Sequence, residues 1–182
     1  AILHFMGRAI PDSIRKIAAF EGVDGRMESV DKGQDYNVIV DYAHTPDALR
    51  NALSMLRECT EGKVHLVFGC GGDRDKGKRL EMTKVACAGA DQVWATADNP
   101  RTEPLDDIFK DMKKGQTRGS RISFVEDRRR AISLALDQAK SGDCVLIAGK
   151  GHESFQEVQY TAIPFDDREV VRELINIKAL VQ

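Results

Sequence analysis

Short apolar runs alternate with longer amphipathic stretches along most of the chain. Runs rich in β-branched residues occupy positions 37–41, 63–68, 92–96, 121–125 and 143–148. Their composition is typical of strands buried on both faces of a sheet. After each of these runs the pattern predicts a helix, over residues 46–59, 78–89, 104–114, 127–140 and 167–180. This alternation favours an α/β, Rossmann-like fold with a mostly parallel sheet and helices on both faces.

Polar residues mark the starts of three of these helices. Thr45 precedes a proline at the first helical position, and Thr102 stands two residues before another proline, so we expect both to cap. Asp166, followed three residues later by Glu169, resembles a capping box with Asp in place of Ser or Thr.

The first 26 residues differ from the rest of the chain. Apolar positions at helical spacing predict a short helix over residues 11–20, and the glycines at 22 and 25 indicate a hinge or domain boundary close to residue 26. The chain opens at Ala1, without methionine, on an apolar segment that looks like the end of a helix. We therefore expect a fragment of a longer protein.

Composition narrows the class of protein. With 182 residues, 42% of them hydrophobic and 31% charged, the chain has the balance of a globular domain that can bury a core. A net charge of -2 offers no electrostatic reason to expect nucleic acid or an anionic membrane as partner. The sequence contains neither an apolar run near the roughly 18 residues of a membrane span nor a signal-peptide pattern, so we expect a cytoplasmic protein.

The four cysteines show no metal-binding pattern. Cys59, Cys70, Cys87 and Cys144 have no C-x-x-C spacing, and the histidines do not pair with them. We expect reduced, mostly buried thiols and no metal site.

Candidate chemistry lies where the predicted strands end, because ligands of open α/β sheets bind beyond the carboxyl ends of the strands. Four such segments are unusually polar: Asp-Tyr-Ala-His-Thr-Pro at 41–46, Gly-Cys-Gly-Gly-Asp-Arg-Asp-Lys-Gly-Lys-Arg at 69–79, Asp-Asn-Pro-Arg at 98–101 and Gly-Lys-Gly-His-Glu at 149–153. Any one of them alone is explained by helix caps, tight turns or solvated charges. The glycine-rich segment matches neither G-x-G-x-x-G nor G-x-x-x-x-G-K-[ST], so the sequence holds no dinucleotide fingerprint and no P-loop.

In this order and spacing, the four segments together resemble the C-terminal domain of the Mur ligase family, and within it the type that adds meso-diaminopimelate to UDP-N-acetylmuramoyl-L-Ala-D-Glu. The resemblance extends from residue 25 to residue 169. It implies that residues 27–182 form this C-terminal domain and that residues 1–26 are the tail of a central ATPase domain and a hinge.

The resemblance also implies a reaction. Such ligases use ATP and Mg²⁺ to convert the terminal carboxylate of the UDP-muramoyl dipeptide into an acyl phosphate, which the amine of meso-diaminopimelate attacks. The C-terminal domain binds that amino acid and closes on ATP. Because the P-loop and metal ligands are missing here, we expect this chain alone to be inactive, to contain no catalytic residue and to bind no cofactor tightly.

Site residues follow from the matching positions. The resemblance assigns meso-diaminopimelate to Arg74, Asn99, Arg101, Gly149 and Glu153. Two guanidinium groups, an amide and a carboxylate complement a diamino diacid. Arg101 is expected to pair with the carboxylate that lysine lacks, and Glu153 with the distal ammonium group.

The nucleotide is assigned to three other positions, Arg26, Asp41 and His44. The alternative for Arg26 is an exposed hinge residue. Four further cations are expected to be solvated, namely Lys76, Lys78, Arg79 and Lys150.

Two alternatives remain open. A stand-alone nucleotide or amino-acid sensor could share the fold without catalysis. A related ligase, such as a folylpolyglutamate or cyanophycin synthetase or a Mur ligase for another amino acid, could share most of the segments. The Asp-Asn-Pro-Arg segment favours the diaminopimelate type.

Overall fold

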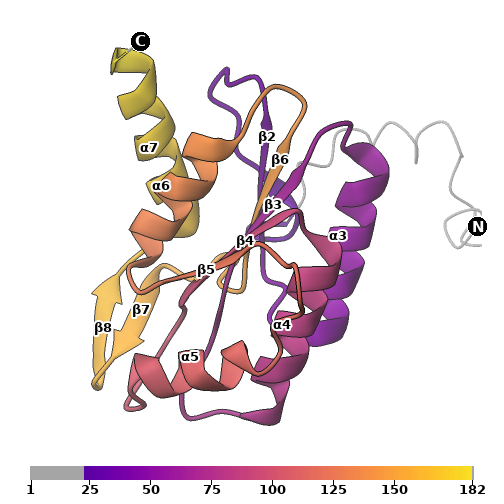
Figure 1. Ribbon diagram of the computed structural model, residues 1–182. Helices are drawn as coiled ribbons and strands as arrows, with labels where there is room; N and C mark the ends of the chain where they lie inside the picture. The colour runs from indigo at the N-terminus through magenta and orange to yellow at the C-terminus, as the bar shows by residue number, and fades with distance from the viewer. Residues whose placement is uncertain (1–22, 182) are drawn as a thin grey trace, which may run out of the picture.

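The computed structural model describes residues 23–181. The helix predicted over residues 11–20, and most of the segment assigned to a preceding domain, lie outside the described residues. Six strands form one sheet in the order β1-β2-β6-β3-β4-β5, with β1 antiparallel to β2 and the other neighbours parallel (Figure 1). Their bounds are β1 Glu28–Ser29, β2 Asn37–Asp41, β3 Val64–Cys70, β4 Gln92–Ala97, β5 Ile122–Val125 and β6 Cys144–Ala148.

Helices cover both faces of this sheet. They are α3 Pro46–Cys59, α4 Gly77–Gly89, α5 Leu105–Lys113, α6 Arg128–Gln138 and α7 Asp167–Val181. Helices α3, α4 and α5 lie on one face, and α6 and α7 lie on the other (Figure 1). The α/β, Rossmann-like architecture predicted from the sequence is therefore confirmed.

Two hydrophobic layers hold the helices on the sheet. All residues of β3 and β6 are buried, as their nearly unbroken apolar composition predicts. Leu53 and Met82 pack with Phe68 on the α3–α4 face, whereas Leu136 packs with Trp94 on the α6–α7 face. Strand β3 runs to Cys70, two residues further than predicted, so Gly69 is part of the sheet.

Of the three predicted caps, two are confirmed. Thr45 accepts a hydrogen bond from the backbone N–H of Ala48 at 3.2 Å, and Asp166 accepts one from Arg168 at 2.9 Å. The side chain of Glu169 pairs with Arg172 rather than completing a capping box.

The prediction for Thr102 is wrong. Pro104 occupies the cap of α5 and offers no side-chain acceptor. The Thr102 hydroxyl instead donates to the carboxylate of Asp73 at 2.8 Å, because the loop after β4 packs against the loop after β3.

An additional hairpin was not predicted. Strands β7 Phe155–Val158 and β8 Thr161–Pro164 pair antiparallel outside the main sheet (Figure 1). The two turn residues, Gln159 and Tyr160, both have positive φ, a conformation usually filled by Gly, Asn or Asp. The sequence therefore lacks the usual signal for this turn.

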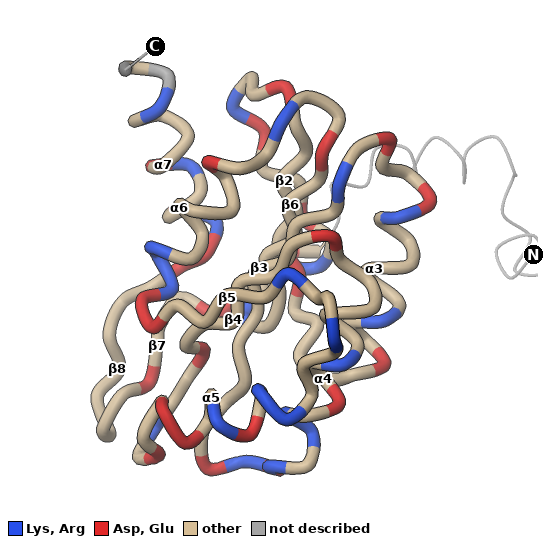
Figure 2. The backbone as a smooth tube through the Cα atoms, viewed as in Figure 1, with Lys and Arg blue, Asp and Glu red and all other residues tan. Residues whose placement is uncertain are grey.

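Acidic and basic residues are interspersed over the helices and loops, while the central strands carry few of them (Figure 2). Within residues 23–181, none of the helices combines the length and apolarity needed to cross a bilayer.

Candidate functional site

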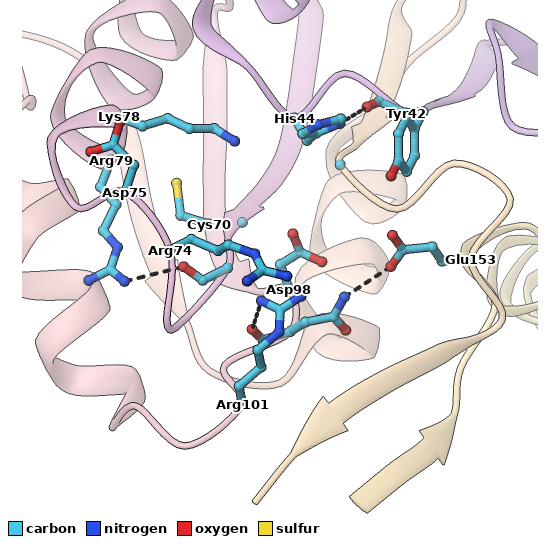
Figure 3. A pocket seen from close by; sticks show the side chains of 14 residues that line it. Tyr42, His44, Cys70, Arg74, Asp75, Lys78, Arg79, Asp98, Arg101 and Glu153 are labelled. Carbon is cyan, nitrogen blue, oxygen red and sulfur yellow. Dashed lines mark hydrogen bonds between the residues drawn. The ribbon is translucent and has the colours of Figure 1, made fainter. Parts of the chain in front are cut away.

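A pocket of about 430 Å³ opens at the carboxyl ends of the parallel strands. It is lined by all five residues assigned to the amino acid, Arg74, Asn99, Arg101, Gly149 and Glu153. In Figure 3, the side chains of Arg74, Asp98 and Arg101 converge near its centre, and Glu153 approaches from the side of the β7–β8 hairpin. The topology thus brings together three segments that lie far apart in the sequence.

Glycines allow two of these segments to pack closely. A Cβ atom at Gly72 would lie 1.9 Å from the carbonyl oxygen of Pro100, and one at Gly69 would lie 2.5 Å from that of Thr96. Gly149 adopts a φ of +118°, which a side chain would strain. The glycine-rich loop is therefore built for contact with the Asp-Asn-Pro-Arg segment rather than for cradling a dinucleotide.

Hydrogen bonds join the same two loops. The backbone N–H of Gly72 donates to Asn99 O at 2.9 Å, and Asp73 accepts from the backbone N–H of Thr102 at 3.0 Å as well as from its hydroxyl. These bonds from Thr102 lower the pKa of the Asp73 carboxyl. The contacts hold the two loops in a fixed relation before any ligand binds.

Arg101 is held from two sides. Its backbone has a φ of +53°, and it pairs with β7 through a bond from its N–H to Glu157 O at 2.9 Å. In its side chain, Nη1 donates to Gly72 O at 2.9 Å and Nε lies 3.0 Å from Oε2 of Glu157. Nη2 has no hydrogen-bond partner among residues 23–181 and remains available to a carboxylate.

The prediction that Lys150 is solvated is wrong, since it is fully buried beneath the pocket. Its Nζ donates to Asn99 Oδ1 at 3.1 Å and to Glu153 Oε2 at 3.2 Å, and Asn99 Nδ2 donates to the same Glu153 oxygen at 2.9 Å. The apolar stem passes inside the protein while the ammonium group meets polar partners, which the local sequence does not indicate.

Asp98 opens the Asp-Asn-Pro-Arg segment, but nothing in the sequence assigned it a role of its own. Its carboxylate lines the pocket, and Oδ1 is buried without a hydrogen-bond partner among the described residues. Nζ of Lys150 is 3.8 Å from this oxygen. Asp98 thus adds a second carboxylate to the side of the pocket formed by Glu153.

The prediction for Arg79 is also wrong, since only 1% of it is exposed. It donates to both carboxylate oxygens of Glu103, to Asp111 and to Gly71 O. These bonds from Arg79 are the main cause that lowers the pKa of Glu103 to about 2. Arg79 therefore ties α4 to the start of α5 directly under the glycine-rich loop.

The other two cations predicted to be solvated lie closer to the surface. Lys76 is exposed and forms an ion pair with Glu103 at 3.1 Å. Lys78 is half-buried and lines the pocket.

The residues assigned to the nucleotide lie beside the pocket around Tyr42. The guanidinium carbon of Arg26 is 4.4 Å from the centroid of the Tyr42 ring, and the His44 ring meets Tyr42 edge-on with centroids 4.5 Å apart. His44 lines the pocket, and its Nδ1 is 2.8 Å from Tyr42 O. A cation and an imidazole therefore flank one aromatic ring.

Asp41 belongs to this group but is already engaged by the backbone. It is buried, and its two carboxylate oxygens accept from the backbone N–H groups of Met27 and Ala43, each at 2.8 Å. Met27 has a positive φ of 45°. Asp41 thus anchors the bend that follows the predicted hinge, in addition to any contact with a ligand.

All four cysteines are free thiols. Cys70 and Cys144 are buried, Cys87 is half-buried and Cys59 is exposed. Burial raises the pKa of Cys70, the cysteine at the pocket, to about 12, so its thiol is neutral. In the described part of the chain, no group of three or more His, Cys, Asp or Glu side chains could hold a metal ion.

Comparisons with known proteins identify the family of the chain. A family profile described as "Mur ligase, glutamate ligase domain" matches residues 25–151. UDP-N-acetylmuramoyl-L-alanyl-D-glutamate–2,6-diaminopimelate ligase of Bacillus licheniformis is 51% identical over 159 residues, which cover 87% of this chain and 32% of the relative. The protein of the same name from Prochlorococcus marinus is 47% identical over 97% of this chain and 36% of its own length.

A solved structure of a ligase with this name superposes with a TM-score of 0.83 at 42% identity, covering 97% of this chain and 36% of that one. UDP-N-acetylmuramate-alanine ligase of Thermotoga maritima shares the fold, with a TM-score of 0.67 at 20% identity. The chain spans about a third of the length of the curated relatives it matches. The extent of the profile match and these identities show that the chain belongs to the Mur ligase family.

Proposed function

We propose that this chain is the amino-acid-binding domain of an ATP-dependent ligase that adds meso-diaminopimelate to UDP-N-acetylmuramoyl-L-Ala-D-Glu. The relatives that match at 43–51% identity carry the name of that ligase. In this proposal residues 27–182 form the domain, and residues 1–26 belong to the tail of the preceding ATPase domain and the hinge. The proposed location is the cytoplasm, where ATP and a UDP-linked substrate are both at hand.

The observation that supports the proposal most is the distribution of charge in the pocket. Arg74 and Arg101 provide guanidinium groups, whereas Asp98, Asn99 and Glu153 provide two carboxylates and an amide. A diamino diacid presents two carboxylates and two ammonium groups at its two ends, so both kinds of group find partners. Alanine or glutamate would leave part of this set unpaired.

The protein's contribution to the reaction is positioning. The α-amine of the amino acid must be held within near-attack distance of the acyl carbon while water is kept out. Arg101 is held by Gly72 and Glu157 and is not free to rotate, so a carboxylate bound to it fixes the far end of the ligand. In this arrangement the near end would lie on the side of the pocket lined by His44.

ATP and Mg²⁺ would supply the phosphoryl group that activates the dipeptide carboxylate. Arg26 fits a nucleotide phosphate, because its guanidinium group carries donors and lies beside Tyr42. His44 also lies beside Tyr42, but its Nδ1 donates to Tyr42 O, so its Nε2 donates to a phosphate only when the ring is protonated. Asp41 fits a ribose hydroxyl only through the lone pairs that its two backbone bonds leave open. Within residues 23–181 no group of three or more His, Cys, Asp or Glu side chains could hold the magnesium ion, so the nucleotide phosphates would supply part of its ligands.

A calorimetric panel tests the proposal. The 182-residue chain is titrated with meso-diaminopimelate, lysine, alanine and glutamate at pH 7 and low ionic strength. We expect meso-diaminopimelate to bind and the other three to bind at least about 100-fold more weakly, since each leaves a charged group of the pocket unpaired. Tighter binding of alanine or glutamate would point to a ligase for another amino acid.

A further inference from the structure

Lys150 is a fully buried cation for which the proposed reaction has no direct use. It follows β6 and has no exposed surface. Removing an ammonium group from water costs several kcal/mol unless partners compensate for its charge and satisfy its N–H groups. Its partners are Asn99 Oδ1 and Glu153 Oε2, with Asp98 Oδ1 at 3.8 Å, and all three residues line the pocket.

One consequence concerns the direction of the Asn99 amide. Its Oδ1 accepts from Nζ of Lys150 and from the backbone N–H of Glu157 at 3.0 Å. Both neighbours are donors, so the oxygen must face them and the amide nitrogen must face Glu153, to which it donates. Lys150 therefore helps, together with the Glu157 N–H and Glu153, to fix which end of Asn99 is turned toward Glu153.

A second consequence concerns the charge below the pocket. Arg128 is buried under the ends of β4 and β6, where it donates to Ala97 O at 3.3 Å and Ala148 O at 3.1 Å and pairs with Asp167. Two cations, Lys150 and Arg128, thus face three carboxylates, those of Asp98, Glu153 and Asp167. Counted without Arg74 and Arg101, which are assigned to the ligand carboxylates, the cluster carries one net negative charge, which a single ligand ammonium group would neutralise.

We infer that Lys150 is a positioning residue that orients Asn99 and adjusts this side of the pocket to accept one ammonium group. The inference rests on the proposed function, because it presumes an amino acid in the pocket. Without the Lys150 charge, the cluster has an excess of two negative charges, and we expect a proton to bind there while the pocket is empty.

Two variants and one control test the inference in the same chain. Lys150→Met removes both the charge and the hydrogen bonds, whereas Lys150→Gln removes the charge and retains a donor. Lys110→Met makes the same chemical change on the exposed face of α5. Thermal unfolding of each variant verifies that it folds.

The first readout needs no ligand. The side-chain amide resonances of Asn99 are recorded by NMR, with their hydrogen-exchange rates. We expect slow exchange in the wild-type chain and in Lys110→Met, and faster exchange with shifted resonances in Lys150→Met. Unchanged Asn99 resonances in a folded Lys150→Met chain would overturn the orienting role.

The second readout is proton linkage. meso-Diaminopimelate is titrated at pH 7 in buffers of different ionisation enthalpy, which gives the number of protons exchanged on binding. We expect both Lys150 variants to bind about 10- to 100-fold more weakly. Ligand binding to each variant should also release about one proton more than binding to the wild-type chain does. The reason is that the ammonium group of the ligand displaces the proton that the carboxylates of the empty variant pocket have bound in place of the Lys150 charge.

The measurements distinguish a failure of the inference about Lys150 from a failure of the proposed function. Wild-type affinity in Lys150→Met, or weaker binding without extra proton release in both variants, would overturn the charge-adjusting role and leave the proposed function intact. A wild-type chain that binds no meso-diaminopimelate would instead contradict the proposed function, while the Asn99 measurement would still decide the orienting role.

Discussion

Arg101 is the residue on which the choice of amino acid is expected to depend. Its Nη1 and Nε are bound to Gly72 and Glu157, and Nη2 has no partner in the described part of the chain. Lysine, which lacks the second carboxylate of meso-diaminopimelate, would leave this half-buried guanidinium group unpaired. A site built around such a group can reject the shorter ligand strongly.

We therefore expect Arg101→Ala to weaken binding of meso-diaminopimelate about 10- to 100-fold and to narrow the preference over lysine. Competition titrations followed by NMR measure both affinities. Glu153→Ala is the comparison, because both ligands carry the distal ammonium group and should be weakened together. An Arg101→Ala chain that keeps the wild-type preference would show that selectivity lies elsewhere.

For individual residues, the sequence motifs predicted which side chains meet in the pocket, but they did not predict which charged side chains are buried. The five amino-acid positions meet in one pocket, because each follows a strand of a parallel sheet. Arg79 and Lys150 were predicted to be solvated, as charged residues usually are. Their burial depends on Glu103, 24 residues away, and Asn99, 51 residues away, which no local pattern reveals.

The arrangement of elements depends on another buried cation, Arg79, which joins α4 and α5 through Glu103. The ion pair lowers the pKa of Glu103 to about 2. A carboxyl whose folded-state pKa lies below its unfolded value stabilises the fold above the unfolded value, near 4, and loses this contribution as the pH falls toward 2.

Glu103→Gln should accordingly lower the free energy of unfolding at pH 7 by on the order of 2 to 3 kcal/mol. The difference from wild type should shrink as the pH falls from 5 to 2. Urea unfolding across this range measures it. Glu173→Gln, which affects only the exposed pair with Arg129, is the control and should cost less than about 1 kcal/mol at any pH. A pH-independent difference for Glu103→Gln would contradict the assigned ion pair.

Elements with strong hydrophobic patterns were predictable, and those defined by contacts were not. The five parallel strands and five helices of residues 23–181 follow from periodicity and caps. The β7–β8 hairpin was missed because Gln159 and Tyr160 are not the residues that favour its turn. Its position depends instead on two backbone bonds, from Arg101 N–H to Glu157 O and from Gln159 N–H to Arg101 O, which form only when the sheet is assembled.

For the molecule as a whole, the two layers of core on either side of one sheet indicate a unit that folds independently. We expect the chain to unfold in a single cooperative transition and to show no ATP hydrolysis, since its sequence contains no P-loop. Denaturant unfolding followed by two probes and a phosphate-release assay measure these properties. ATP hydrolysis above background in a pure preparation would refute the proposal that the preceding domain, and not this one, carries the ATPase activity.

The most direct test of the account is to locate meso-diaminopimelate on the chain. Backbone and side-chain resonances of the ¹⁵N-labelled protein are followed during a titration with the amino acid. We expect the shifted resonances to belong to the pocket residues, namely Arg74, Asn99, Arg101, Gly149 and Glu153. Shifts confined to the groove between α3 and α4 near Arg57 and Lys84, or no shifts up to millimolar ligand, would contradict the central claim.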